Sequence, residues 1–217
     1  MKYYYQNTRP EMVQFLPPRY LKVLEIGCGT GAFRRNLKNQ NEYWGVEVDI
    51  SAAELAKSKL DKVLNGYFLE KSLDIPNNYF DLVICNDVIE HIDDYESFIM
   101  DIKNKMTHDA CLVLSVPNIR HMQCLYHLMV KKDWQYQDHG VLDRTHLRFF
   151  TYKSLVRLIK KNGFEILKIQ GINSVYERVS LIRKIFLYIA AAVLGKDTLY
   201  LQFGLSAKIK THHPSIH

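Results

Sequence analysis

Glycines and acidic residues near the N-terminus have the spacing of a nucleotide-binding loop. Gly27, Gly29 and Gly31 lie close together, and Glu25 stands two residues before the first of them. Glycines permit a tight turn and let a ligand approach the backbone, and a helix that starts after them offers free N–H groups. Glu47 follows further along, where a carboxylate can accept hydrogen bonds from both hydroxyls of a ribose. The spacing predicts a cofactor that carries a ribose.

Two classes of cofactor remain open on these residues. The run Gly27-x-Gly29-x-x-Ala32 also satisfies the loose dinucleotide fingerprint, so a nicotinamide-dependent oxidoreductase is an alternative. Glu25 favours S-adenosyl-L-methionine, because a carboxylate there repels a pyrophosphate but can hold the cationic methionine part of the methyl donor. A glycine turn without any ligand is the third interpretation.

A second group of residues is suited to proton transfer. His91 follows Glu90 shortly after a predicted strand, and Asp143 and His146 lie close together in a later polar segment. Such side chains can remove a proton near neutral pH, which methylation of a hydroxyl requires. His91, His146 and Asp143 are therefore the candidate catalytic residues, with helix capping or packing an equal alternative for His91. Glu90 and His91 cannot form a metal site alone, so we expect no metal.

The polar segment belongs to an expected acceptor-side loop at about residues 118–150. Arg144 and Arg148 are candidates to bind an anionic group of a substrate, and His121 fits the same pocket. Aromatic side chains in this loop suit a sugar ring or a hydrophobic carrier. A salt-bridged latch that only positions the loop is the alternative.

Short apolar runs alternate with helical patterns along the chain, which positions these residues at strand ends. Strands are predicted at residues 21–26, 43–48, 81–85, 110–116, 164–170 and 199–209. Helices are predicted around Phe33 and Leu37, from a cap at Asp49 or Ser51 through Leu64, at 95–106 and at 154–162. The alternation predicts right-handed crossovers and a mainly parallel sheet. The last run alternates strictly, which is typical of an antiparallel strand with one less buried face.

Composition limits the class of protein. A chain of 217 residues with 47% hydrophobic and 24% charged residues fits one α/β domain over 1–217. The first residues lack the apolar core of a signal peptide, so we expect a cytoplasmic protein. The net charge of +6 is spread without a basic block, and we expect no nucleic-acid partner. The cysteines show no close pairs and are expected to be buried, reduced thiols; they are Cys28, Cys85, Cys111 and Cys124.

A helical insertion is expected at about residues 174–196, and its apolar part is 179–194. This part is too short to span a bilayer. It could pack on the sheet, cover the pocket, join two copies as a homodimer, or lie peripherally on the inner face of a membrane. The histidines at 212, 213 and 217 are expected to belong to a solvated tail.

Five segments of the chain resemble class I S-adenosylmethionine-dependent methyltransferases. They are VLEIGCGTGAF, GVEVDISAAELAKSKL, FDLVICNDVIEHIDD, SVPNIRHM and GVLDRTHLRFFT, in the family's order. They are similar in particular to bacterial methyltransferases associated with O-antigen and other surface-glycan biosynthesis. The resemblance implies a Rossmann-like, seven-stranded, mostly parallel α/β sheet with helices on both faces and an antiparallel last strand.

The resemblance also implies the cofactor-binding residues. Glu25 and the three glycines would hold the methionine part of the cofactor, Glu47 the ribose, and the segment after Gly66 the adenine. Relatives carry an aspartate after that glycine where this chain has Tyr67, so adenine contacts are expected near Phe68 and Leu69. Asn86 and Asp87 would line the methyl end, because open α/β sheets bind ligands at the carboxyl ends of their strands.

The expected function is methyl transfer from S-adenosyl-L-methionine, leaving S-adenosyl-L-homocysteine, to a hydroxyl of a sugar, glycan or related small molecule. The alternative enzyme is a small-molecule O- or N-methyltransferase of lipid, quinone or secondary metabolism. An alternative of another class is a non-catalytic, cofactor-binding scaffold. Binding of the donor without turnover on any acceptor would distinguish the scaffold from both enzymes.

Overall fold

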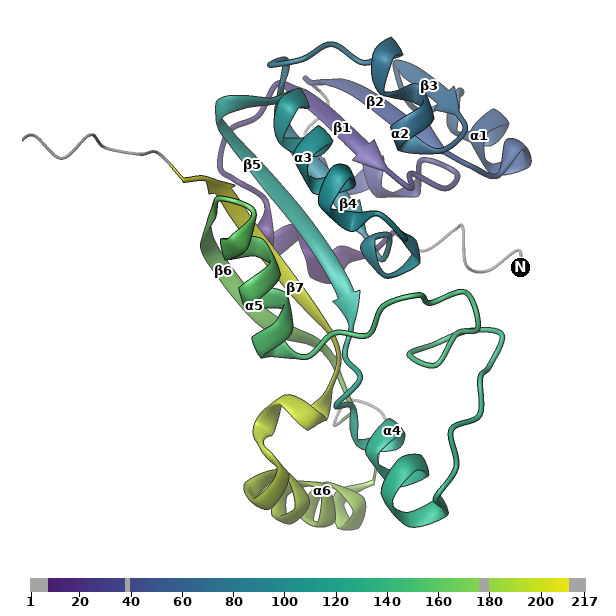
Figure 1. Cartoon of the computed structure of the whole chain (residues 1–217), viewed down its shortest axis with the longest axis vertical. Coiled ribbons are helices and arrows are strands. Elements are labelled where there is room, and N and C mark those ends of the chain that lie inside the picture. The colour runs from purple at the N-terminus through teal and green to yellow at the C-terminus, as the bar shows by residue number, and fades with distance from the viewer. Residues whose placement is uncertain (1–7, 38–39, 176–179, 211–217) are drawn as a thin grey trace, which may run out of the picture.

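The computed structural model describes residues 8–37, 40–175 and 180–210 (Figure 1). Its strands are β1 (Lys22–Ile26), β2 (Glu42–Glu47), β3 (Lys62–Asn65), β4 (Phe80–Asn86), β5 (Met106–Pro117), β6 (Phe164–Ser174) and β7 (Tyr200–Ile209). Its longer helices are α1 (Ile50–Ala56), α3 (Tyr95–Lys105), α5 (Tyr152–Lys161) and α6 (Leu181–Leu194). Short helical segments are η2 (Pro10–Phe15), η3 (Ala32–Asn36), α2 (Phe68–Lys71), η4 (Ser72–Asp74), η5 (Ile89–His91), α4 (Met122–Tyr126), η6 (His127–Lys131) and η8 (Lys196–Leu199).

The strands form one seven-stranded sheet in the order β3-β2-β1-β4-β5-β7-β6. The first five strands in this order pair in parallel, and β7 runs antiparallel to both of its neighbours. The predicted Rossmann-like α/β fold with an antiparallel last strand is confirmed. The carboxyl ends of β1, β2 and β4 therefore meet at one edge of the sheet, where the predicted cofactor residues lie.

Helices cover both faces of the sheet, because alternate residues of the strands point to opposite sides. On one face Val83 and Leu112 pack with Phe98 of α3 and Leu155 of α5 in a large apolar core. On the other face a second core contains buried residues of η2, η3, α1 and the strands, among them Met12, Phe15, Phe33, Ala56, Leu82, Ile84 and Val113. The two cores hold the sheet rigid beneath the loops that carry the site.

The predicted helix through Leu64 is wrong in its second half. Helix α1 ends at Ala56, with Asp49 accepting the Ala52 N–H as its N-terminal cap, and residues 62–65 form β3. Val63 and Leu64 pair in parallel with β2, so strand pairing overrides their helical spacing. The segment around Phe33 is a 3-10 helix.

The expectation of a less buried face on the last strand is also wrong. Strand β7 lies between β5 and β6, and its residues from Phe203 to Ala207 are all buried. Segment η2 covers this face of β7. A Cβ at Gly204 would lie 2.4 Å from the Phe15 ring of η2, so only glycine leaves room for that ring. The strand at this edge of the sheet is β6 and not the last strand, β7.

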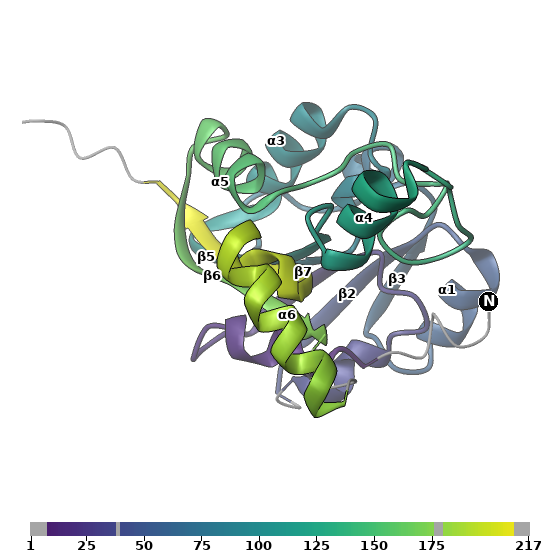
Figure 2. The same ribbon diagram turned by 90° about the horizontal axis from the view of Figure 1, so that it is seen from below.

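The four cysteines are all buried and unpaired, as predicted. Helix α6 falls within the expected insertion, of which residues 176–179 lie outside the described residues, as does the histidine tail at 211–217. Across the described ranges of the chain, none of the helices has the length and apolar character needed to cross a membrane. Helices α4 and α6 project together beyond one end of the sheet (Figures 1 and 2).

Candidate active site

The glycine loop joins the end of β1 to η3 and depends on left-handed backbone conformations. Gly27, Gly29 and Gly31 have φ angles of 72°, 53° and 70°. A Cβ on Gly27 would also lie 2.6 Å from Cγ2 of Val88, which is closer than carbon atoms approach. Two independent constraints therefore require glycine at the first position of the loop. The backbone is left open to close approach by a ligand.

Glu47, the last residue of β2, holds this loop in place. Its Oε2 accepts the backbone N–H of Gly29 at 2.7 Å, and its Oε1 accepts that of Asp49 at 2.9 Å. The side chain is buried. Each carboxylate oxygen keeps a further lone pair, so the same group can still accept hydrogen bonds from the hydroxyls of a ribose.

Glu25 on β1 lies beneath the loop. It is buried, and its Oε2 accepts the hydroxyl of Tyr43 at 2.6 Å. Burial raises the pKa of Glu25 to about 8, and the nearby charge of Glu47 adds to the rise. A cation bound here would lower that pKa again and favour the carboxylate. The position suits the positively charged part of a cofactor.

Asn86 and Asp87 follow one another at the carboxyl end of β4. Both polar atoms of the Asn86 amide are buried without a hydrogen-bond partner among the described residues. Such buried polar atoms are costly unless a ligand or water completes them. Asp87 has a φ of 53°, a conformation that places its carboxylate away from the strand and into a polar network.

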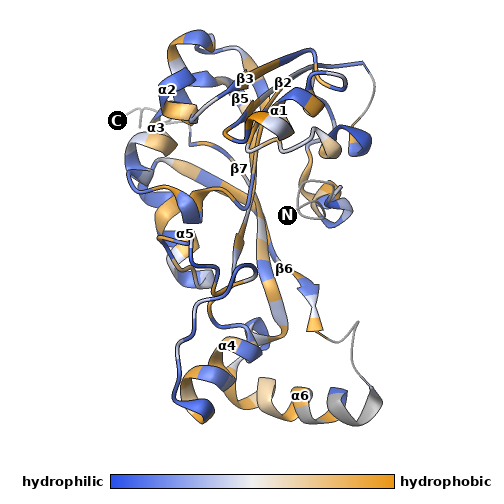
Figure 3. Cartoon of the chain, turned by 90° about the vertical axis from the view of Figure 1, so that its right-hand side faces the viewer, coloured by the Kyte–Doolittle hydropathy of each residue, from blue (hydrophilic) through white to orange (hydrophobic). Residues whose placement is uncertain are grey.

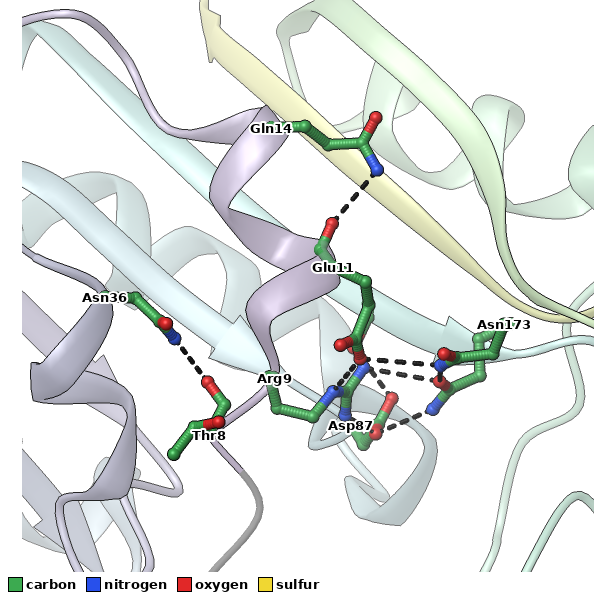
Figure 4. A network of polar contacts seen from close by, with 9 residues as sticks. Thr8, Arg9, Glu11, Gln14, Asn36, Asp87 and Asn173 are labelled. Carbon is green, nitrogen blue, oxygen red and sulfur yellow. Dashed lines mark hydrogen bonds and ion pairs between the residues drawn. The ribbon is translucent and has the colours of Figure 1, made fainter. Parts of the chain in front are cut away.

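Arg9, just before η2, reaches this network from the N-terminal segment (Figure 4). It makes an ion pair with Asp87, whose other oxygen accepts the hydroxyl of Ser115 at 2.7 Å. Gln202 of β7 donates to Asp87 at 2.7 Å and accepts from Asn173 at 2.7 Å. The carboxylate after β4 is thus fixed by groups from β5, β7 and the N-terminal segment. Sequence reasoning missed Arg9, Ser115 and Gln202, because nothing local marks contacts so distant along the chain.

The segment after β3 carries the two residues predicted near the adenine. Phe68 is buried in the core with its ring edge-on to Phe98, at 5.4 Å between centroids. Leu69 is exposed. Gly66 donates its N–H to the Glu47 carbonyl at 2.9 Å, which holds the segment beside the ribose-side carboxylate. Adenine binding by Phe68 and Leu69 stays a prediction. Because the Phe68 side chain is buried in the core, this contact would involve its backbone groups.

A cavity of about 70 Å³ opens beside Asp87. Its lining mixes polar and apolar residues and comes from four regions of the chain: Asp87, Glu90, Pro117, Gly140, Val141, Asp143, His146, Leu201 and Gln202. Asp87 belongs both to this wall and to the strand end that carries Asn86. A group bound in the cavity would lie next to the cofactor edge of the sheet. We call this space the acceptor pocket.

The predicted catalytic residues lie close together, although His91 and His146 are far apart in the sequence. Asp143 and His146 line the acceptor pocket, and His91 lies beside His146. Their rings are 4.8 Å apart between centroids. The Glu90 carbonyl accepts the N–H groups of Leu147 and Arg148, at 2.8 and 3.0 Å, and this pairing holds the two segments together. Burial lowers the pKa of His91, and the neighbouring His146 adds to the fall.

Asp143 acts through its neighbour. One of its carboxylate oxygens accepts both the N–H of Thr145 at 2.8 Å and its hydroxyl at 2.7 Å. The Thr145 hydroxyl and carbonyl oxygens each lie 3.1 Å from Nδ1 of His91. Asp143 thus fixes the group that orients the His91 ring.

None of the three predicted substrate residues lines this pocket. Arg144 pairs with Asp138 at 2.5 Å and its side chain is 65% exposed. Arg148 lines a different cavity with Tyr95 and Phe149, and donates to the Asp93 carbonyl at 2.9 Å. His121 is buried just before α4, and burial lowers its pKa. Substrate binding by these three residues stays a prediction from the sequence, which the exposed ion pair of Arg144 does not favour.

Known proteins share both sequence and fold with this chain. A family model described as a methyltransferase domain matches residues 1–169. An uncharacterized protein of Methanocaldococcus jannaschii is 26% identical over 172 residues, which are 70% of this chain and 64% of that protein. The mitochondrial ubiquinone biosynthesis O-methyltransferase of Schizosaccharomyces pombe is 32% identical over 102 residues, 43% of this chain and 37% of the enzyme. The chain thus spans less than two thirds of the length of these relatives.

A solved structure agrees in fold over most of its length. The crystal structure of a SAM-dependent methyltransferase from Archaeoglobus fulgidus superimposes with a TM-score of 0.67 at 20% identity. The match covers 91% of this chain and 90% of that one. The covered share is larger than residues 1–169, so the likeness in fold extends past the part of the chain that the family model matches.

Proposed function

The chain belongs to the methyltransferase domain family, and from this premise we propose that it transfers a methyl group from S-adenosyl-L-methionine to a hydroxyl oxygen of a sugar-like acceptor. The cofactor lies across the carboxyl ends of β1, β2 and β4. The acceptor lies in the acceptor pocket, and the reaction leaves S-adenosyl-L-homocysteine.

The donor half of the proposal rests on the chemistry of the strand ends. Glu25 is buried and its pKa is raised, so a neighbouring positive charge would stabilise its ionised form. The ammonium and sulfonium groups of the donor supply such charges. Glu47 offers two acceptors for a ribose diol. Asn86 presents unpartnered amide atoms where a cofactor would complete their hydrogen bonds. The open backbone of the glycine loop completes the cradle.

One observation carries the acceptor half: the acceptor pocket shares Asp87 with the cofactor edge and also contains His146 and Glu90. Methyl transfer is an in-line displacement, in which the acceptor oxygen bonds to the methyl carbon as the carbon–sulfur bond breaks. The protein therefore has to align the two reactants and assist loss of the hydroxyl proton. His91, His146 and Asp143 lie where they can serve that proton loss.

The polar side chains within the pocket lining favour a sugar or glycan hydroxyl. Asp87, Asp143 and Gln202 present carboxylate and amide groups to the pocket, which suit an acceptor with several hydroxyls. The test is methyl transfer from isotopically labelled donor to a panel of nucleotide-linked and free sugars, with deoxy analogues as matched controls. Label in a sugar and none in its deoxy analogue would support the proposal. Label in none of the sugars would contradict it.

A quinone or lipid hydroxyl is the second candidate. The Schizosaccharomyces pombe relative is named as a ubiquinone biosynthesis O-methyltransferase. The projecting helix α6 is also rich in hydrophobic residues (Figure 3), several of which are exposed. Phenolic lipid analogues therefore belong in the same acceptor panel, and label there in place of sugars would favour this candidate.

The projecting end supports a peripheral place on the inner face of a membrane, in the cytoplasm. Ile185, Tyr188, Ile189 and Val193 are exposed on α6, and Leu128, Met129 and Val130 on η6. The side chains of Lys131, Lys132 and Lys184 are exposed beside them. Apolar side chains flanked by lysines bind the interface of an anionic bilayer. A membrane-bound acceptor would then reach the enzyme at this end.

A further inference from the structure

Glu90 has an unusual place in the acceptor pocket. Its side chain is fully buried, and both of its carboxylate oxygens lack a hydrogen-bond partner among the described residues. A buried acid without partners is costly to keep in a folded protein. Cys85 and Asp87, close along the chain, add no hydrogen bond to it. The oxygens of Glu90 are therefore candidates to bind a group from outside the described residues.

Two imidazoles complete a set of ligands around this acid. Glu90, His91 and His146 each offer one ligand atom, and these three atoms lie within 4.8 Å of one another. Metal–ligand bonds are about 2.1 Å long, so an ion would draw the side chains together by about 1 Å. Exposed acidic groups often gather without an ion, whereas Glu90 is buried and His146 is 9% exposed.

The hydrogen bonds of both rings engage Nδ1 and leave Nε2 free to bind an ion. Nδ1 of His146 lies 2.9 Å from the Val141 carbonyl, and Nδ1 of His91 lies 3.1 Å from the Thr145 carbonyl. A carbonyl oxygen can only accept, so Nδ1 carries the hydrogen in each ring and Nε2 keeps its lone pair. Histidine ligands of metals regularly donate their other N–H in this way. Asp143 extends the pattern, because it fixes Thr145.

From this geometry we infer that Glu90, His91 and His146 bind one divalent transition-metal ion, which orients the acceptor hydroxyl toward the methyl donor. Imidazole ligands favour ions such as Co²⁺ and Zn²⁺ over Mg²⁺, which prefers oxygen. The sequence predicted no metal, because His146 could not be placed beside the adjacent pair. The inference rests on the proposed function and specifies how its three catalytic candidates act.

The chemistry balances without a further reactant. The acceptor oxygen binds the ion, which favours loss of the hydroxyl proton to solvent. The oxygen then forms a bond to the methyl carbon while the carbon–sulfur bond breaks. The electron pair of that bond stays on sulfur, and neutral S-adenosyl-L-homocysteine is released. Two imidazoles and one carboxylate leave coordination positions open for the acceptor.

The test is titration of the full chain with Co²⁺, followed by visible absorption, and with Zn²⁺, followed by calorimetry. The tail histidines at 212, 213 and 217 are replaced by alanine in every sample, so that they do not bind the probe. We expect one ion per chain. Glu90→Gln and His146→Ala should each weaken binding at least ~10-fold, and the indirect change Thr145→Val by about 10-fold. His108→Ala removes an exposed histidine and should leave the affinity unchanged.

Each outcome is decisive. No binding of either ion, or equal affinity in the wild-type chain and the folded variants, would overturn the inference. Thr145→Val changes no ligand, so it keeps the test valid if a ligand variant fails to fold. Every sample is also titrated with S-adenosyl-L-homocysteine, whose affinity should not change. Loss of metal binding with intact cofactor binding therefore tests this inference apart from the proposed function.

Discussion

The carboxylate of Glu47 accepts the backbone N–H of Gly29 at 2.7 Å, so the acid that ends β2 holds the glycine loop that follows β1. Glu47 and the glycine loop, which lie apart in the sequence, therefore form one structural unit. Because the carboxylate already fixes the loop, its loss should affect both the ribose contact and the shape of the cofactor site.

Replacing Glu47 should therefore weaken cofactor binding in a graded way. Glu47→Ala removes both acceptors and should cost about 1–3 kcal/mol of S-adenosyl-L-homocysteine affinity. Glu47→Gln keeps one acceptor oxygen and should cost less. Calorimetric titration measures both, with Glu54→Ala on the exposed side of α1 as the control. Wild-type affinity in Glu47→Ala would remove this residue from the cofactor site.

Gly27→Ala should destabilise the protein by about 1–3 kcal/mol, because it adds a strained backbone and a clash with Val88. Gly140→Ala is a matched control, since Gly140 also has a positive φ of 88° but no atom within 4 Å of an added Cβ. Gly140→Ala should lose only the part of the free energy of unfolding that is due to backbone strain. Urea unfolding of both variants measures the difference. Adding Val88→Ala should relieve the clash part of the Gly27→Ala loss, and equal losses in the two single variants would show that Val88 plays no part.

The pKa of Glu25 predicts how stability depends on pH. Its pKa is about 8 in the folded chain, above the ordinary value of 4.5, so the folded state keeps a proton that the unfolded state releases. The free energy of unfolding should therefore fall as the pH rises from about 4.5 to 8. Glu25→Gln should flatten this fall when urea unfolding is measured without cofactor at pH 5 to 8. Parallel curves for the variant and the wild-type chain would contradict the raised pKa.

Two neighbouring residues should differ sharply in turnover. His146→Ala removes a group from the acceptor pocket and should lower kcat/KM by at least ~100-fold. Arg144→Ala should change kcat/KM by less than about threefold, because its exposed ion pair with Asp138 contributes little. Steady-state kinetics with the acceptor found in the panel measures both. A large loss in Arg144→Ala alone would move the acceptor away from the pocket.

Membrane association should depend on the apolar side of α6. The combined changes Ile185→Ser, Tyr188→Ser and Ile189→Ser should reduce binding to anionic vesicles by at least ~10-fold, because each removes exposed apolar area that the bilayer would bury. Leu73→Ser is the control, since Leu73 is 99% exposed on a different segment. Co-sedimentation with anionic and neutral vesicles provides the measurement. Equal binding by the triple variant would exclude this surface as the contact.

The sequence predicted the cofactor edge better than the acceptor side. Glu25, Gly27 and Glu47 lie within or directly after short apolar strands, so a local pattern places them at one edge of a parallel sheet. Strand β3 escaped prediction because Val63 and Leu64 also fit a helix, and only pairing with β2 decides between the two.

The acceptor pocket depends on contacts that no local pattern marks. Arg9 meets Asp87, and His146 meets His91, across long stretches of chain. Glu90 was visible beside His91, but its missing hydrogen bonds appear only once the surrounding elements enclose it. Burial and long-range pairing are properties of the whole fold, and a single sequence without relatives does not reveal them.

Binding of S-adenosyl-L-methionine at the edge formed by β1, β2 and β4 is the premise of the proposed reaction. Isothermal titration of the purified chain with S-adenosyl-L-homocysteine, and separately with NAD, tests it most directly. We predict saturable binding of S-adenosyl-L-homocysteine at one site per chain, lost or weakened in Glu47→Ala, and no binding of NAD. Binding of NAD alone would contradict the claim and indicate an oxidoreductase.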